Sequence, residues 1–275
     1  AHLMRLAFDY AKSFGVTLAL HAQDETLSDK GQINESLVST RLGLNGIPNA
    51  AEDVIIARDI MLFEHTNARA HERTSARLHI CHVATERGIE LVAQAKARGL
   101  KVSCEVTPHH FTLTDESIVE YDTNFKMYPP LRSQRDVTAI KAALKKGGII
   151  DAIATDHAPH GLIDKELEFD KAPFGIIGLE TALSLSLNLV RNGIISMNEM
   201  IRLLTSGPAS VFNLPAGTLK TGSLADIVIF NPDQEWTYDE SIIVSKSKNS
   251  PFVGKTLKGK VQWTLVGGEV RHASS

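Results

Sequence analysis

Apolar runs alternate with amphipathic segments from about residue 5 to residue 205. The clearest unit starts with an apolar run at residues 78–83 and continues with a helix that Thr85 caps and Gly99 ends. A second run, at residues 101–106, follows directly. Short apolar runs predict buried strands, and apolar residues at helical spacing predict helices. Their alternation therefore indicates a parallel α/β fold.

Further elements of the same kind flank this unit. Strands are expected at residues 16–20 and 149–154, and helices begin at Asn49 and at Ser133. The Ser-x-x-Asp pattern that starts at Ser133 is typical of a capping box. Residues 22–48 form a long, polar segment without such a pattern. Loops of this length are usually functional or disordered.

The pattern changes at residue 206. From there the chain shows short β runs at residues 226–230, 261–266 and 269–271, and a Gly-Gly pair that is typical of a hairpin turn joins the last two. We therefore expect one domain over residues 1–205 and a small β-rich accessory region over residues 206–275.

Composition narrows the possible partners and location. The 275 residues are 43% hydrophobic and 22% charged, with a net charge of −3 and no basic stripe, which argues against a nucleic-acid partner. No apolar stretch is long enough for a membrane span, and the first residues do not resemble a signal peptide. Because the two cysteines, Cys81 and Cys104, lie inside apolar runs, we expect no disulfide and a cytoplasmic protein.

Potential metal ligands stand at the ends of four expected strands. These are His21, His82, the pair His109-His110, and Asp156. The strand ends of a parallel α/β barrel open onto one face, so ligands that are distant in sequence converge there. Imidazole nitrogen and carboxylate oxygen suit Zn²⁺, and a carboxylate beside the metal can take and return the proton of a water molecule.

The same residues also have structural interpretations. A single histidine at a strand end is more often hydrogen-bonded than metal-bound, and His109-His110 can serve loop packing. His79 lies three positions before His82, so strand alternation points these two side chains to opposite faces. Cys81 and Cys104 are expected to be small buried apolar residues.

Five motifs resemble those of dihydroorotases of the long, bacterial type, in the amidohydrolase superfamily. They occur in the same order and cover nearly the whole chain, and residues 222–230 resemble the superfamily's C-terminal strand. The motifs are His-Ala-Gln-Asp (21–24), Cys-His-Val-Ala-Thr (81–85), Glu-Val-Thr-Pro-His-His (105–110), Thr-Asp-His-Ala-Pro-His (155–160) and Ala-Pro-Phe-Gly-Ile-Ile-Gly-Leu-Glu-Thr (172–181).

The resemblance implies a (β/α)₈ TIM-barrel metal-dependent hydrolase, of which this chain is the C-terminal half with a small β-rich accessory region. It implies zinc-dependent, reversible conversion of L-dihydroorotate and N-carbamoyl-L-aspartate in pyrimidine (UMP) biosynthesis. By the same resemblance, His21 and His82 hold one zinc, while Asp156 holds a second and acts as the general acid/base. The substrates are therefore expected to be small molecules.

The resemblance also assigns substrate contacts. His160 contacts the substrate carboxylate or ring, and the Pro173-Phe174-Gly175 turn offers backbone groups to the ring. One position departs from the family: Tyr128 stands where the family pattern Asn-Pro-Pro-Leu-Arg has the asparagine that contacts the substrate. Tyrosine can still donate a hydrogen bond, but it is larger than asparagine and its reach differs. A dihydropyrimidinase, hydantoinase or allantoinase therefore stays an alternative.

Several parts of the family's site do not occur in these residues. They are the His-x-His of the first barrel strand, the arginine that follows it, and the bridging Asp or carbamylated Lys. The chain is therefore expected to begin just before strand five of eight and to lack an N-terminal part. We expect a homodimer or a complex with aspartate transcarbamoylase. An inactive dihydroorotase-like subunit that serves as a scaffold for that enzyme stays an alternative function.

Overall fold

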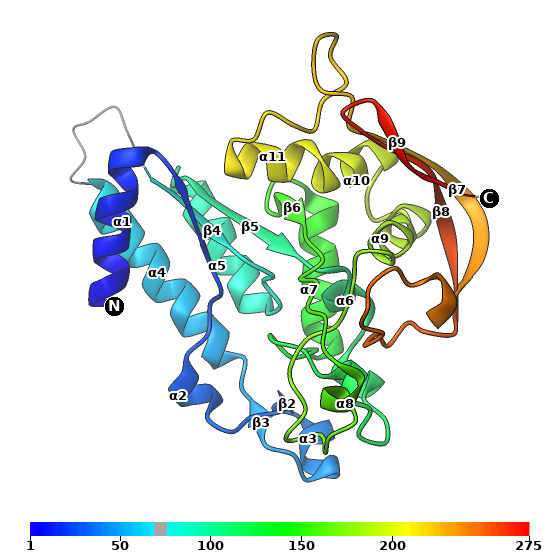
Figure 1. Cartoon of the computed structure of the whole chain (residues 1–275). Coiled ribbons are helices and arrows are strands. Elements are labelled where there is room, and N and C mark those ends of the chain that lie inside the picture. The colour runs from blue at the N-terminus through cyan, green and yellow to red at the C-terminus, as the bar shows by residue number, and fades with distance from the viewer. Residues whose placement is uncertain (69–75, 275) are drawn as a thin grey trace.

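The computed structural model describes residues 1–68 and 76–274 (Figure 1). A four-stranded parallel sheet lies between its helices, and neighbouring strands follow one another in chain order. Each new strand is thus added on the same side, and all carboxyl ends lie at one edge. The strands are β1 (Thr17–Leu20), β4 (Arg77–Ile80), β5 (Val102–Val106) and β6 (Ala152–Ile153).

Helices connect these strands and pack outside the sheet. α1 and α4 lie side by side at the N-terminal end, where Phe8 packs edge-on against Phe63 with ring centroids 5.4 Å apart (Figure 1). α5 begins as predicted, because the Thr85 hydroxyl accepts a hydrogen bond from the Gly88 N–H at 3.0 Å. The helices before the C-terminal sheet are α1 (His2–Phe14), α4 (Ala50–Ala68), α5 (Glu86–Ala97), α6 (Pro108–Thr112), α7 (Gln134–Lys146), α8 (Leu162–Lys165), α9 (Ala182–Arg191), α10 (Met197–Leu204) and α11 (Ser206–Phe212), with 3₁₀ turns η1 (Asp115–Ser117) and η2 (Thr123–Phe125).

Two strands are shorter than predicted. β4 ends at Ile80 and β6 spans only Ala152–Ile153, whereas the sequence indicated strands to residues 83 and 154. Beyond them His82 has φ 36° and Asp156 has φ 47°, which a continuing strand does not allow. Both residues therefore stand just past a strand end in the left-handed conformation.

The predicted capping box at Ser133 is wrong. The Ser133 hydroxyl donates to the Asp136 carboxylate at 2.6 Å and accepts no helix N–H. The other oxygen of this carboxylate accepts from the Asn49 amide and from the Glu86 N–H, each at 3.0 Å. Asp136 thus ties α7 to the starts of α4 and α5.

The segment of residues 22–48 is built of short elements. It contains α2 (Glu25–Ser28), β2 (Ile33–Asn34), α3 (Leu37–Leu42) and β3 (Gly46–Ile47), and β2 pairs with β3 in parallel. The buried Arg132 guanidinium holds this pair, because it donates to the Asn34 side chain at 3.2 Å and to the Ile47 carbonyl at 2.9 Å. The segment is therefore ordered by long-range contacts that its own sequence pattern does not reveal.

A three-stranded antiparallel sheet lies at the C-terminal end, on the side of the molecule opposite α1 (Figure 1). Its strands are β7 (Ile227–Tyr238), β8 (Lys255–Val266) and β9 (Glu269–Ala273), with the 3₁₀ turn η3 (Glu240–Ile242) between β7 and β8. The predicted hairpin between β8 and β9 is confirmed, whereas β7 and β8 are longer than predicted. Among residues 1–68 and 76–274, no helix is both long and apolar enough to cross a membrane.

Candidate active site

Two histidines meet at the carboxyl edge of the parallel sheet. His21 directly follows β1, and His82 follows the neighbouring strand β4. The Nδ1 atom of His21 lies 2.9 Å from the Nε2 atom of His82, and the two rings meet edge to face with centroids 4.7 Å apart. The fold therefore brings together two of the residues that the sequence proposed as metal ligands.

Burial keeps both rings neutral. It lowers the pKa of His21 to about 4, with a further lowering from His82 and an opposing effect from Asp156. Burial also lowers the pKa of His82. Neutral imidazoles have a free lone pair, which is the form that binds a metal.

The pair fits a zinc ion. In tetrahedral zinc sites with bonds of about 2.0–2.1 Å, two nitrogen ligands stand roughly 3.3 Å apart, so the rings need to separate by only a few tenths of an ångström. The other nitrogen of His82, Nδ1, is buried and has no hydrogen-bond partner within the described part of the chain.

Asp156 follows β6 and lies near this pair. Burial raises the pKa of its carboxyl, while the charge of His21 opposes that shift. Across residues 1–68 and 76–274, however, Asp156 does not form a cluster with both histidines in which all ligand atoms lie within 4.8 Å. The structure therefore brings Asp156 to the same edge without placing it beside both imidazoles.

A row of rings connects the histidine pair to a loop at residues 169–175. Tyr128 stacks on His21 with centroids 5.3 Å apart and an interplanar angle of 26°. Its other neighbour is Phe174, at 4.9 Å. The position where this chain departs from the family pattern thus lies between the histidines and the predicted substrate turn.

His160 and Gly175 shape that turn. The Nε2 atom of His160 donates to the Phe174 carbonyl at 2.8 Å, which leaves Nδ1 as an acceptor. Gly175 has φ 125°, and a Cβ atom there would lie 2.5 Å from the Cβ atom of Ala158. Only glycine fits this close approach.

Two buried lysines that sequence reasoning missed hold the loop. The Lys126 ammonium donates to the carbonyls of Phe169 and Ala172, both at 2.6 Å, and lies 4.5 Å from the centroid of the Phe174 ring. The Lys165 ammonium donates to the carbonyls of Pro173 and Gly175 at 3.0 and 3.1 Å. Nothing in the local sequence distinguishes these lysines from exposed ones.

Burial lowers the pKa of both ammonium groups. It brings the pKa of Lys126 to about 8, against an opposing effect of Asp170. It brings the pKa of Lys165 to about 8 as well, and there the charge of Lys126 adds to the lowering. The two lysines are therefore less readily protonated than surface lysines.

Asn249, from the segment between β7 and β8, also reaches this region. Its side-chain amide donates to the carbonyls of Ala158 and Gly175 at 2.9 and 3.0 Å, and its oxygen accepts from the His160 N–H at 3.2 Å. The C-terminal part of the chain therefore supports the turn as well as forming a sheet. No sequence pattern other than its polar side chain marks Asn249 as part of this region.

His109 and His110 are both buried. His110 donates to the Pro129 carbonyl at 2.9 Å and contacts the Thr107 hydroxyl at 2.8 Å, so both of its ring nitrogens are engaged. It thereby supports the backbone directly after Tyr128. This agrees with the loop-packing interpretation of His110.

The sequence matches known proteins along nearly its whole length. Residues 1–271 match the amidohydrolase family. A dihydroorotase from Geobacter metallireducens is 50% identical over 270 residues, which are 98% of this chain and 62% of the relative. A dihydroorotase from Syntrophus aciditrophicus is 48% identical over 268 residues, with 98% and 61% covered. The chain thus spans less than two thirds of the length of these curated relatives.

Solved structures share the fold. The L-hydantoinase (dihydropyrimidinase) from Arthrobacter aurescens aligns with a TM-score of 0.85 at 28% identity, over 98% of this chain and 60% of that protein. The D-hydantoinase (dihydropyrimidinase) from Thermus sp. aligns with a TM-score of 0.84 at 25% identity, over 98% and 60%. Together with the parallel and antiparallel sheets, these matches confirm the predicted fold class.

Proposed function

The chain belongs to the amidohydrolase family, and on this premise we propose that it acts as a dihydroorotase, which interconverts L-dihydroorotate and N-carbamoyl-L-aspartate. The observation that carries the proposal is the 2.9 Å approach of two neutral imidazole nitrogens at neighbouring strand ends. The identity of 50% to a dihydroorotase favours this substrate over hydantoins. Pyrimidine biosynthesis is the pathway that this reaction serves.

In this proposal His21 and His82 would hold one zinc ion, and Asp156 would be a ligand of a second zinc ion. Zinc, when bound, polarises a carbonyl and lowers the pKa of water. Asp156 accepts a proton from the attacking water and delivers it to the ring nitrogen as the amide bond breaks. Its raised pKa suits this exchange, because a carboxyl that is too acidic returns a proton poorly.

The substrate is proposed to lie beside Tyr128 and the 169–175 loop. The Tyr128 hydroxyl offers a hydrogen bond, and the turn at Pro173, Phe174 and Gly175 offers backbone groups. His160 has an acceptor nitrogen left over after its bond to the Phe174 carbonyl, so in its neutral form it accepts a hydrogen bond from a ring N–H. Protonation would instead let it donate to a carboxylate.

A chimera tests the activity and the substrate together. In this chimera, the chain replaces the 270 matching residues of the Geobacter metallireducens dihydroorotase. The chimeric protein is assayed with dihydroorotate, hydantoin, dihydrouracil and allantoin as substrates. We expect dihydroorotate to react fastest and His21→Ala to abolish that reaction. Preference for any other ring would overturn the substrate assignment.

Zinc analysis of the same chimera separates an enzyme from a scaffold. We expect zinc in the purified chimera and fewer zinc ions per protein molecule in its His21→Ala variant. A folded protein without zinc or activity would instead favour an inactive subunit that supports aspartate transcarbamoylase.

Residues 1–205 carry the metal and acid/base groups, and residues 206–275 form the accessory region that contributes Asn249. A cytoplasmic location and a homodimer or a complex with aspartate transcarbamoylase complete the proposal. Analytical ultracentrifugation with and without that enzyme distinguishes the two assemblies.

A further inference from the structure

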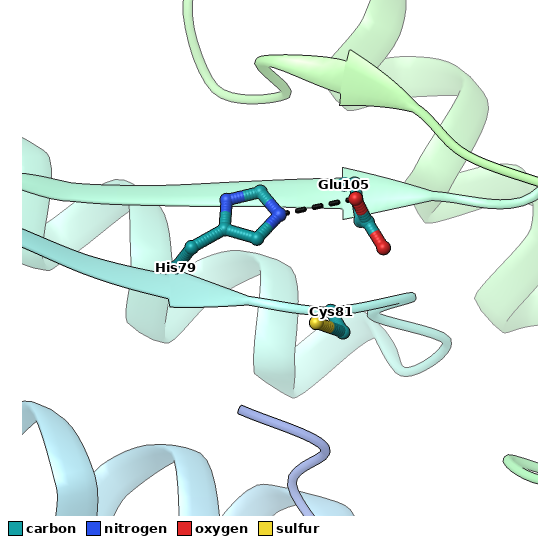
Figure 2. A group of neighbouring side chains, drawn as sticks. All are labelled: His79, Cys81 and Glu105. Carbon is teal, nitrogen blue, oxygen red and sulfur yellow. Dashed lines mark hydrogen bonds and ion pairs between the residues drawn. The ribbon is translucent and has the colours of Figure 1, made fainter. Parts of the chain in front are cut away.

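A second group of metal-binding side chains lies between β4 and β5 (Figure 2). His79 belongs to β4, Cys81 directly follows this strand, and Glu105 belongs to β5. One ligand atom from each of the three residues lies within 4.8 Å of the other two. His79 and Glu105 point toward one another, with His79 Nε2 at 3.1 Å from Glu105 Oε2.

The strand register explains why these side chains converge. β4 and β5 are parallel neighbours, and His79 pairs with Ser103. Residues two apart on a strand share a face, so Cys81 lies on the side of His79, and Glu105 lies on the side of Ser103. The cluster is therefore built on two neighbouring strands and on the residue that directly follows one of them.

Hydrogen bonding fixes the orientation of the His79 ring. Its Nδ1 atom lies 2.8 Å from the Ser103 hydroxyl, which itself lies 3.4 Å from the Leu78 carbonyl. Without a cation, Nε2–H donates to the Glu105 carboxylate and Nδ1 accepts from the Ser103 hydroxyl. The hydroxyl can instead donate to the Leu78 carbonyl and accept from Nδ1–H, and in that tautomer the Nε2 lone pair faces Glu105 and can bind a cation.

The three donors also define the kind of cation. Imidazole, thiolate and carboxylate together favour borderline or soft divalent ions, whereas Mg²⁺ and Ca²⁺ prefer oxygen ligands only. In zinc sites with bonds of about 2.0–2.3 Å, ligand atoms stand roughly 3.2–3.7 Å apart, so a shift on the order of 1 Å closes the cluster. His79, held by Ser103, resembles a metal ligand that is oriented by an outer partner.

We propose that His79, Cys81 and Glu105 form a binding site for a thiophilic divalent cation such as Zn²⁺, Co²⁺ or Cd²⁺. This site uses none of the residues His21, His82 and Asp156. Binding releases the Cys81 thiol proton and any proton shared by His79 Nε2 and Glu105. Three protein donors leave a fourth position for water or another small ligand.

Cobalt titration of the full 275-residue chain tests the site. A thiolate bound to Co²⁺ gives a charge-transfer band in the near ultraviolet, which imidazole and carboxylate ligands do not give. The chain has two cysteines, and Cys104 is buried elsewhere, with its sulfur 3.4 Å from the Ile149 carbonyl. Cys104→Ser is therefore a matched control for Cys81→Ser.

We expect the band in the unaltered chain, in Cys104→Ser and in His21→Ala, and we expect Cys81→Ser to lose it. Glu105→Gln, which keeps the side-chain size, is expected to raise the cobalt concentration at half-saturation at least about 10-fold, because loss of even an outer partner of a metal ligand weakens metal binding by about 10–100-fold. Circular dichroism checks that each variant is folded, and Cys81→Ala replaces Cys81→Ser if the latter is not.

Three results would overturn the proposal. They are no band in the unaltered chain at saturating cobalt, a band that persists in the folded Cys81 variant, and an unchanged titration in Glu105→Gln. None of them bears on dihydroorotase activity, because the band reports sulfur ligation and the proposed catalytic ligands contain no sulfur.

Discussion

The histidine pair and the 169–175 loop are positioned by different means. His21 directly follows β1 and His82 stands two residues after the end of the neighbouring parallel strand β4, so the backbone ladder of the sheet fixes their separation. The loop has no such ladder, and its carbonyls are held by the side chains of Lys126, Lys165 and Asn249. Strand ends thus supply the proposed chemistry, and long side chains from distant segments hold the loop that forms the proposed substrate surface.

Because the two regions are held by different means, substitutions in each should have different effects. Changes at the strand ends should remove chemistry or metal without loosening the loop. Changes at the lysines should loosen the loop and leave metal binding intact.

The largest effect is expected for Asp156→Asn in the chimera. The amide cannot carry the proton, so turnover should fall by roughly 10²–10⁴-fold, the usual contribution of a general acid/base. Steady-state kinetics measures this loss, and circular dichroism should show an unchanged fold. Asp164→Asn, at an exposed position on α8, is the matched control and should keep normal turnover. Near-normal turnover of Asp156→Asn would remove this residue from the mechanism.

His82→Asn should mainly affect zinc binding. Asparagine tolerates the left-handed conformation, which His82 adopts with φ 36°, so the backbone is preserved while the imidazole is lost. Loss of a direct ligand should weaken zinc at least as much as loss of an outer partner, which costs about 10–100-fold. Competition with a chelator measures the affinity. Unchanged zinc affinity would show that His82 is not a ligand.

Lys126→Met tests the other half of the comparison. It leaves buried carbonyls of the loop without their donor, which should lower the free energy of unfolding by about 1–3 kcal/mol. Denaturant unfolding measures the change. The exposed Lys171, which pairs with Glu168 at 3.2 Å, gives a control, since Lys171→Met should change stability by less than about 0.5 kcal/mol. Equal effects of the two substitutions would mean that Lys126 does not hold the loop.

The smallest effect is a pH dependence. The pKa of Lys165 lies at about 8 in the folded chain, below its ordinary 10.5, so the unfolded chain binds more protons above pH 8. The free energy of unfolding should therefore rise from pH 8 to pH 9, by at most about 1.4 kcal/mol per pH unit for one lysine. The slope should be smaller in Lys165→Met. Above pH 9 the thiols act in the opposite direction, because burial raises the pKa of Cys81 and Cys104 from 9.0 to about 12. A slope that is the same in Lys165→Met would contradict the assigned pKa.

The sequence by itself determined the α/β class, the order of the strands and which polar residues stand near their carboxyl ends. His21 and His82 could be found because apolar runs mark buried strands, and parallel strands expose their carboxyl ends at one edge. The same reasoning missed the ends of β4 and β6. It followed apolar character, whereas the left-handed backbone at His82 and Asp156 ends the ladder.

Only the tertiary structure decided how the 169–175 loop is supported and how His79, Cys81 and Glu105 converge. Asn249 and His160, for example, are 89 residues apart in the chain and belong to different parts of it. A lysine or asparagine has the same local pattern whether it faces solvent or a buried carbonyl, so its role appears only when folding brings the distant segment to it. Strand periodicity, in contrast, is a local property, and for this reason the sheet edge at which His21 and His82 meet could be predicted and the supports of the loop could not.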